Sequence, residues 1–368
     1  MNSSHISDRV SRLRLRMAEE GMDVIVLIVS ERYNCESLAY ISGFRGSSGA
    51  AVISAKEAFL VTDGRYALQA RAQSPFQVIL HDGSRLAARV EELLRNGNWA
   101  VAGFEAERLS VGLFRALEGC GAAWRDCSGF LPSLRRKKDG LEVSHIRRAG
   151  EIAWGAYEEV LGEVREGMSE MDLNALLEYS LRKRGAEGGW TGGGFIVASG
   201  ERSALPHGMP TDRRFRRGDL VTVDFGATVE GYMSDLTRNF SLGPLSGRTL
   251  EMESALLCAH RKAADLLRPG VECRAVDAAA RCVIVDAGWG PNFPHGLGHG
   301  LGLEVHEAPR LSRTSEDVLM EGDVVTIEPG IYLEGWGGLR IEDDYLVTAE
   351  GGICLSGGKG QSVAVLEP

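Results

Sequence analysis

The stretch Val221-Thr-Val-Asp-Phe-Gly226 places a carboxylate, Asp224, inside an apolar run typical of a β-strand. Burying a carboxylate is costly unless it is paired with a cation or hydrogen-bonded. Two more strand-like runs pose the same problem, since Glu328 follows residues 324–327 and Glu342 follows residues 339–341. An ion pair or a strand-end cap would explain one such residue. Three of them in one chain indicate a shared functional site.

Two further segments add ligand-type side chains. Ser234-Asp-Leu-Thr-Arg238 contributes Asp235, and His295-Gly-Leu-Gly-His-Gly-Leu-Gly302 contributes two histidines among alternating glycines. Glycines let backbones approach closely, which suits a ligand-lined cleft. Carboxylates that converge in a protein interior repel one another unless positive charge neutralises them, and two divalent metal ions would do so. A mostly carboxylate set with one imidazole favours Mn²⁺, Co²⁺ or Fe²⁺, with Zn²⁺ also possible.

A length of 368 residues predicts two domains. The apolar run Val24–Val29 has the length of a buried strand, and strand-like and helical segments alternate after it. This alternation predicts an α/β domain over residues 1–132, a linker over 131–140 and a second domain over 139–368. Expected helices cover residues 8–21, 65–72 and 111–117, and expected strands cover residues 50–54, 58–62 and 100–104.

An internal repeat runs through the second domain. A helix is expected from residue 170 to 184, with Ser169 as its N-cap and Gly185 just beyond its C-terminus. The segment Gly270–Gly288 repeats this pattern 103 residues later. We interpret the repeat as a duplicated α/β half that gives a pseudo-symmetric domain.

The charge balance limits the partners of the chain. Its 41 basic and 51 acidic residues give a net charge of −10, which argues against nucleic acid or an anionic membrane surface. The basic tracts Arg135–Lys138 and Arg213–Arg217 are interpreted as solvated loop or linker charge. Seven dispersed cysteines and the polar segment Met1–Val10 predict a cytoplasmic protein with reduced thiols.

The motifs resemble the creatinase/aminopeptidase "pita-bread" metallopeptidases, in the proline-directed branch of aminopeptidase P and prolidase. The resemblance implies a creatinase-like α/β N-terminal domain and an α+β pseudo-symmetric pita-bread C-terminal domain. The matching segments are Tyr40-Ile-Ser-Gly-Phe44, Ala204-Leu-Pro-His-Gly208, Val223-Asp-Phe-Gly226, Ser234-Asp-Leu-Thr-Arg238, His295-Gly-Leu-Gly-His-Gly300, Leu303-Glu-Val-His-Glu307, Glu328-Pro-Gly330 and Arg340-Ile-Glu342.

The resemblance also implies a metal-ligand set. Asp224 would chelate one metal, Asp235 and Glu342 would bridge both, and His299 and Glu328 would complete the second. Creatinase itself uses this fold without the metal ligands, so their presence favours peptidase chemistry.

The remaining site roles are likewise carried over from the resemblance. His207 and His306 would line the cleft and stabilise the tetrahedral intermediate, and His295 would lie near the prolyl side of the substrate. Arg340 would contact the bridging carboxylates and orient them without binding a metal itself. Glu328 is also expected to move a proton from water to the leaving nitrogen.

The expected activity is hydrolysis of the Xaa-Pro bond at the N-terminus of a peptide by a homodimeric aminopeptidase. The alternative is an Xaa-Pro dipeptidase, if Arg310 anchors a dipeptide carboxylate rather than lying on the surface after Pro309. A more remote alternative, a non-catalytic binding module, would be expected to have lost metal ligands. Trp190, in the unusual stretch 188–194, either narrows the cleft or is an exposed loop aromatic.

Overall fold

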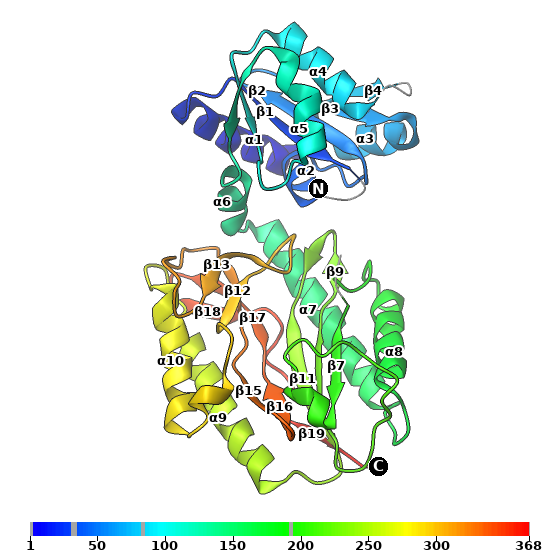
Figure 1. Cartoon of the computed structure of the whole chain (residues 1–368), viewed down its shortest axis with the longest axis vertical. Coiled ribbons are helices and arrows are strands. Elements are labelled where there is room, and N and C mark those ends of the chain that lie inside the picture. The colour runs from blue at the N-terminus through cyan, green and yellow to red at the C-terminus, as the bar shows by residue number, and fades with distance from the viewer. Residues whose placement is uncertain (1–2, 31–34, 82–84, 191–193, 368) are drawn as a thin grey trace. The chain divides into compact units, whose positions relative to one another are not determined.

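The computed structural model describes residues 3–30, 35–81, 85–190 and 194–367 (Figure 1). The chain divides into two compact units, Met1–Arg135 and Arg136–Pro368. The division lies inside the expected linker, residues 131–140. Much of that segment is helical, since helix α6 spans Phe130–Arg136 and helix α7 (Gly140–Leu161) begins at its end.

The N-terminal unit contains a mixed β-sheet with helices around it (Figure 1). Its strands are β1 (Val24–Val29), β2 (Gly49–Ser54), β3 (Ala58–Asp63), β4 (Gln77–His81), β5 (Val101–Phe104) and β6 (Ala123–Asp126), in the order β4-β3-β2-β1-β5-β6. Its helices are α1 (Ser3–Glu19), α2 (Cys35–Ser42), α3 (Ala67–Gln73), α4 (Leu86–Gly97) and α5 (Val111–Leu117). Every residue of β1 is buried. The α/β class expected for this unit is confirmed.

Two halves of similar design make up the C-terminal unit (Figure 1). The first contains α7, α8 (Glu170–Lys183), β7 (Ile196–Ser199), β8 (Leu220–Phe225), β9 (Thr228–Val229), β10 (Tyr232–Met233) and β11 (Leu236–Leu242). The second contains α9 (Gly247–Ala264), α10 (Cys273–Asp286), β12 (Gly298–Gly300), β13 (Glu307–Leu311), β14 (Val324–Ile327), β15 (Gly330–Leu333), β16 (Gly337–Arg340), β17 (Asp343–Thr348) and β18 (Gly351–Cys354). The last strand, β19 (Ala364–Leu366), returns to the sheet of the first half.

The two halves share their topology. The sheets have the orders β19-β11-β8-β7 and β13-β12-β14-β17-β18. In each half three strands pair antiparallel in succession, β7 with β8 with β11 and β12 with β14 with β17. The first residues of helices α8 and α10 are 103 positions apart, and so are their last residues. Ser169 caps α8 as expected. The expected pseudo-symmetric domain is therefore confirmed.

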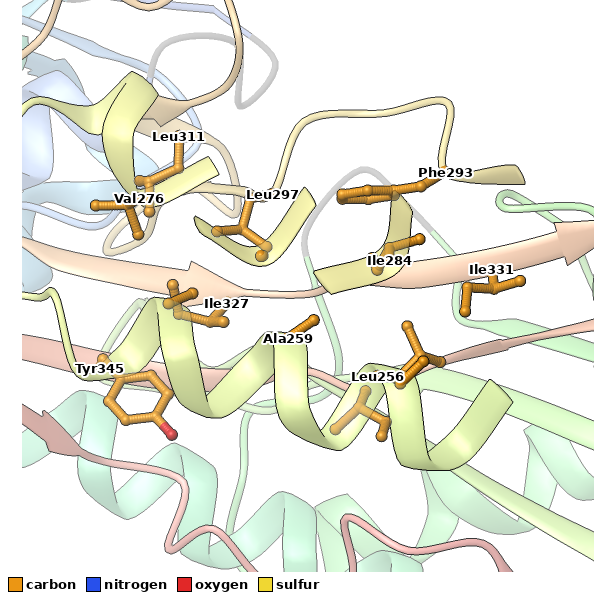
Figure 2. Packing of buried hydrophobic residues seen from close by; sticks show 14 of the residues in the cluster. Leu256, Ala259, Val276, Ile284, Phe293, Leu297, Leu311, Ile327, Ile331 and Tyr345 are labelled. Carbon is orange, nitrogen blue, oxygen red and sulfur yellow. The ribbon is translucent and has the colours of Figure 1, made fainter. Parts of the chain in front are cut away.

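Each half has its own apolar core between its helices and its sheet. Figure 2 shows the core of the second half, a cluster that includes Leu256 and Ala259 of α9, Ile284 of α10 and Ile327 of β14. Fully burying a leucine or isoleucine side chain contributes about 1.5–3 kcal/mol. This core fixes β14, and Ile327 immediately precedes the candidate ligand Glu328.

Candidate metal centre

Strand alternation in the first half points two carboxylates away from the helices. Val223 and Phe225 belong to the core beneath α7 and α8. Since successive side chains of a strand point to opposite faces, Asp224 between them faces the other way. Asp235 likewise precedes a core residue, Leu236, at the start of β11. Because Leu236 pairs with Phe225 across β8 and β11, both carboxylates lie at the same end of this strand pair.

The second half repeats the arrangement. Ile327 and Ile341 are core residues, and each is followed directly by a candidate ligand, Glu328 or Glu342. Glu328 comes just after β14 and Glu342 just before β17, and these two strands pair antiparallel. Each half therefore contributes two carboxylates from the ends of one strand pair.

His299 joins the carboxylates from β12, between two glycines that admit close backbone contact. A Cβ atom at Gly298 would lie 2.1 Å from the carbonyl oxygen of Thr326, and one at Gly300 would lie 2.1 Å from that of Ala308. Any side chain at either position would push β12 away from its neighbours. The glycines thus allow the close backbone approach that the sequence predicts, and this packing positions His299.

The ligand atoms converge. The Nε2 atom of His299 lies 3.2 Å from Oε1 of Glu328 and 3.7 Å from Oδ2 of Asp235. Within the described residues, Asp235, His299 and Glu342 each offer a ligand atom, and these atoms lie within 4.8 Å of one another. The Nδ1 atom of His299 lies 3.1 Å from the carbonyl oxygen of Gly300. A hydrogen bond there leaves Nε2 directed at the carboxylates, as in many metal-binding histidines.

The charges of this cluster call for a cation. Burial, followed by the charges of Glu342 and Asp224, raises the pKa of Asp235 well above its usual value. Burial, Glu328 and Asp224 do the same to the pKa of Glu342, and burial raises the pKa of Asp224 despite the nearby Arg340. Burial also acts to raise the pKa of Glu328, but the hydrogen bond and charge of His299 lower it to about 2. Bound cations among these oxygens would lower the pKa values of Asp224, Asp235 and Glu342 again and keep these three carboxylates ionised beside Glu328.

The fit to a divalent metal is also visible in unpartnered atoms. Among the described residues, Oδ1 of Asp224 and Oδ1 of Asp235 are buried and accept no hydrogen bond. A buried polar atom without a hydrogen-bond partner destabilises the folded protein, unless a bound ligand supplies the missing contact. Oxygen-rich donors with one imidazole suit divalent metal ions. The donor set therefore fits the metal ions that the sequence predicts.

Arg340 balances part of the negative charge. One guanidinium nitrogen donates to Oδ2 of Asp224 at 2.7 Å, and Nε donates to the hydroxyl of Thr237 at 2.9 Å. Thr237 in turn donates to Oε2 of Glu342 at 2.6 Å. Arg340 thus contacts Asp224 directly and reaches Glu342 through Thr237. The sequence pattern of Ser234-Asp-Leu-Thr-Arg238 does not predict this linking role of the Thr237 hydroxyl.

Tyr332 is a site residue that the sequence pattern did not reveal. Its hydroxyl accepts a hydrogen bond from Arg340 at 2.8 Å and lies 3.0 Å from Nε2 of His295. The Nδ1 atom of His295 lies 2.7 Å from the carbonyl oxygen of Gly296. Both ring nitrogens of His295 therefore have partners within the protein, and His295 is one of the residues that line the cavity.

The cluster opens into a cavity of about 650 Å³. Its wall contains all five candidate ligands and every other residue with a predicted site role: His207, His295, His306, Arg310 and Arg340. The imidazoles of His299 and His306 lie edge to face, with ring centroids 4.3 Å apart. His306 is exposed to solvent, but partial desolvation of its ring by the surrounding protein, followed by the charges of His299 and Arg310, lowers its pKa to about 4. His306 is thus neutral near pH 7.

Trp190 also lines this cavity. Its indole nitrogen donates to the carbonyl oxygen of Ser234 at 2.8 Å, directly before Asp235, and its ring lies edge-on against Phe195. Trp190 is therefore a half-buried residue of the cavity wall and not an exposed loop aromatic. Residues 191–193 of the same stretch lie outside the described residues.

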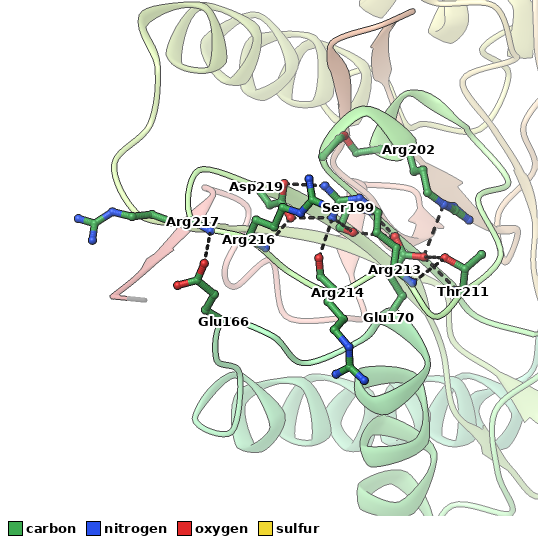
Figure 3. Close-up of polar contacts among 12 residues, drawn as sticks. Glu166, Glu170, Ser199, Arg202, Thr211, Arg213, Arg214, Arg216, Arg217 and Asp219 are labelled. Atoms are coloured by element: carbon green, nitrogen blue, oxygen red, sulfur yellow. Dashed lines mark hydrogen bonds and ion pairs between the residues drawn. The ribbon is translucent and has the colours of Figure 1, made fainter.

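The interpretation of the basic tracts as solvated charge is wrong for Arg136 and Lys138 in the first tract, whereas Arg214, Arg216 and Arg217 in the second are exposed as expected. Arg136 pairs with Asp323 at 2.7 Å and Lys138 with Glu307 at 3.0 Å. In the other tract, Arg213 pairs with Asp219 at 2.6 Å (Figure 3). Among the described helices, none is both long enough and apolar enough to cross a membrane. No disulfide joins the seven cysteines, all of which lie in the described part of the chain.

Comparisons with known proteins place these observations in a family. The chain matches the metallopeptidase family M24 over residues 144–349 and the creatinase/prolidase N-terminal domain over residues 9–137. An Xaa-Pro dipeptidase of Pyrococcus horikoshii is 40% identical over 260 residues, which cover 65% of this chain and 74% of that protein.

Two solved structures resemble the whole chain. An Xaa-Pro dipeptidase from Bacillus anthracis has a TM-score of 0.92 and 36% identity, and the match covers 98% of this chain and 100% of that one. An X-Pro aminopeptidase from Thermotoga maritima has a TM-score of 0.90 and 37% identity, and the match covers 95% and 100% of the two chains. The chain belongs to metallopeptidase family M24, with a creatinase/prolidase-type domain preceding its peptidase domain.

Proposed function

We propose that this chain hydrolyses the Xaa-Pro bond at the N-terminus of short peptides with two divalent metal ions held by Asp224, Asp235, His299, Glu328 and Glu342. The observation that carries the proposal is the convergence of these donors, with two buried oxygens unpartnered among the described residues, on the wall of one cavity. Such ions lower the pKa of water and polarise the scissile carbonyl. The oxygen-rich donor set favours Mn²⁺.

The protein side chains supply proton transfer and oxyanion stabilisation. Glu328 takes a proton from the attacking water and passes it to the prolyl nitrogen as the bond breaks. Thr326 donates to Oε1 of Glu328 at 3.2 Å, which helps to orient this carboxylate. His207 and His306 lie on the cavity wall. As a neutral imidazole, His306 donates a single N–H to the oxyanion that develops on the carbonyl.

Arg310 favours a dipeptidase as the more specific form of this function. Arg310 is exposed on the cavity wall. Its backbone N–H donates to Asp317, but within the described residues its guanidinium makes no hydrogen bond. A guanidinium is well suited to bind a carboxylate, because its donors match the two oxygens. The C-terminal carboxylate of an Xaa-Pro dipeptide is the substrate group that such an arginine would bind. The Xaa-Pro dipeptidases among the similar proteins agree with this assignment.

We also propose a cytoplasmic homodimer. The absence of disulfides among the cysteines, all in described positions, supports a reducing compartment. The dimer rests on the family resemblance, and light scattering of the purified protein tests it.

A peptide assay on metal-stripped protein tests the function. Each candidate metal is restored in turn, and an Xaa-Pro dipeptide, an Xaa-Pro-Xaa tripeptide and the matching Xaa-Ala peptides are offered. We expect metal-dependent cleavage of the prolyl substrates, fastest for the dipeptide. Equal cleavage of the alanyl peptides, or no cleavage of any prolyl peptide with any metal, would overturn the proposal.

A further inference from the structure

The loop between β7 and β8 carries His207 to the cavity. It starts at Ser199, the last residue of β7, and runs past Thr211, and three of its residues, Pro206, His207 and Met209, line the cavity wall. His207 itself is exposed. After the 3-10 helix Gly200–Ala204, residues 205–211 have no regular secondary structure. Side-chain contacts therefore help to fix where the imidazole of His207 lies.

A buried carboxylate outside the metal cluster holds both ends of this loop. Glu170, in the first turn of α8, is completely buried. Its Oε1 atom accepts hydrogen bonds from the backbone N–H and the hydroxyl of Ser199, at 2.9 and 2.7 Å. Its Oε2 atom accepts the same two kinds of bond from Thr211, at 3.0 and 2.7 Å (Figure 3). One carboxylate thus satisfies four donors, two at each end of the loop.

The interior of the loop is tied to the same carboxylate and to the cavity wall. Arg202 lies 3.6 Å from Oε2 of Glu170 and donates to the carbonyl oxygen of Met209 at 2.6 Å. Further along, the carbonyl oxygen of Pro206 accepts a hydrogen bond from Arg340 at 3.1 Å. The segment around His207 is therefore fixed from Glu170 on one side and from Arg340 on the other.

We propose that Glu170 is a positioning residue for catalysis, which sets the place of His207 by holding the two ends of the 199–211 loop. The inference rests on the proposed role of His207. Hydrogen bonds to an ionised acceptor are about twice as strong as neutral ones, and a carboxylate is the side chain that accepts four bonds through two oxygens. A glutamine has the same shape, but its amide nitrogen donates, so one end of the loop loses both of its bonds.

Glu170→Gln is the test variant, and Glu166→Gln is its matched control. Glu166 is exposed and accepts one bond from the backbone N–H of Arg217, outside the loop (Figure 3). We expect Glu170→Gln to speed hydrogen exchange in peptides covering 199–211. We also expect it to lower kcat/KM on an Xaa-Pro dipeptide by about 10- to 100-fold, the scale of a catalytic group displaced by about an ångström. The control should change neither.

A double-mutant cycle separates positioning from general destabilisation. In a His207→Ala background, Glu170→Gln should cause little further loss of kcat/KM, because the group that it positions is gone. Fully multiplicative losses, unchanged kcat/KM, or unchanged exchange in the loop would each overturn the inference. If Glu170→Gln does not fold, Thr211→Val, which removes one bond at one end, goes through the same cycle. Failure of the wild-type protein to cleave any Xaa-Pro peptide would instead overturn the proposed function, and the exchange measurement would still report on the loop.

Discussion

A guanidinium nitrogen of Arg340 lies 2.7 Å from Oδ2 of Asp224, and both side chains are almost completely buried. This contact places a permanent cation beside the candidate metal ligands. Removing one partner of a buried ion pair leaves the other charge uncompensated, which costs about 3–5 kcal/mol. Bound metal ions would compensate Asp224 in place of Arg340.

Arg340→Gln should therefore lower the free energy of unfolding by about 3–5 kcal/mol in EDTA, and by clearly less in saturating Mn²⁺. Urea titrations under the two conditions measure this difference. Arg310→Gln serves as the control, because it removes an exposed arginine from the same cavity. An equal loss of stability with and without metal would show that Arg340 does not share its charge-balancing role with bound cations.

Arg310 should decide between dipeptides and longer peptides. Replacing it with methionine removes the donor for the dipeptide carboxylate, and an interaction of about 1.4 kcal/mol corresponds to a tenfold change in affinity. We expect KM for an Xaa-Pro dipeptide to rise about tenfold, with little change for an Xaa-Pro dipeptide amide. Steady-state kinetics on this substrate pair give the answer. A similar rise in KM for both would mean that Arg310 does not bind the carboxylate.

Trp190 should influence the choice of the first substrate residue. It shares the cavity wall with two other apolar residues, Ile196 and Met209. Trp190→Ala should reduce kcat/KM for Leu-Pro relative to Gly-Pro by about tenfold, since such apolar contacts contribute about 1–3 kcal/mol. Trp190→Phe keeps a ring and should retain most of the preference. Equal effects of Trp190→Ala on both substrates would show that Trp190 does not influence the choice of the first substrate residue.

We expect the buried His260 to make the free energy of unfolding sensitive to acid. Its side chain is 3% exposed and lies 3.6 Å from Asp343, but burial outweighs this carboxylate and lowers the pKa of His260 to about 4. Between pH 6.5 and 4 the unfolded chain binds a proton at His260 that the native protein does not, so stability falls as the pH falls. The full loss below pH 4 is about 3 kcal/mol, from about 1.4 kcal/mol per pKa unit.

Urea titrations of metal-free protein at several pH values between 7 and 4.5 test this prediction. The wild-type protein should lose more stability over this range than His260→Leu, which has no proton to bind at this position. Parallel stability curves for the two proteins would mean that His260 has the same pKa in the native and unfolded states.

Much of the fold and the metal cluster could be predicted from local sequence. The run Val24–Val29 forms a buried strand as expected, and the apolar neighbours of Asp224, Glu328 and Glu342 predicted strand positions through alternation. Strands β4 and β6 were not predicted, because they are short and lie largely outside the core: β4 has an apolar run of only three residues, Val78-Ile-Leu80, and β6 has none of that length.

The residues that sequence reasoning missed act over long separations. Glu170 binds Ser199 and Thr211, which are 29 and 41 positions away. Tyr332 meets His295 through the packing of β15 beside the glycine-rich segment. No local periodicity reports such contacts, because they depend on how separate elements pack. Asp224, Glu328 and Glu342 could be recognised because each interrupts or ends an apolar strand-like run, whereas the full set with Asp235 and His299 followed from the family resemblance.

The most direct test of the metal-centre account is a count of bound cations made together with an activity assay. The wild-type protein, loaded with Mn²⁺ and desalted, should hold two cations per chain and cleave an Xaa-Pro dipeptide, whereas Asp235→Asn should lose both the cations and the cleavage. Full cleavage by the wild-type protein after complete removal of metal, or by Asp235→Asn, would contradict it.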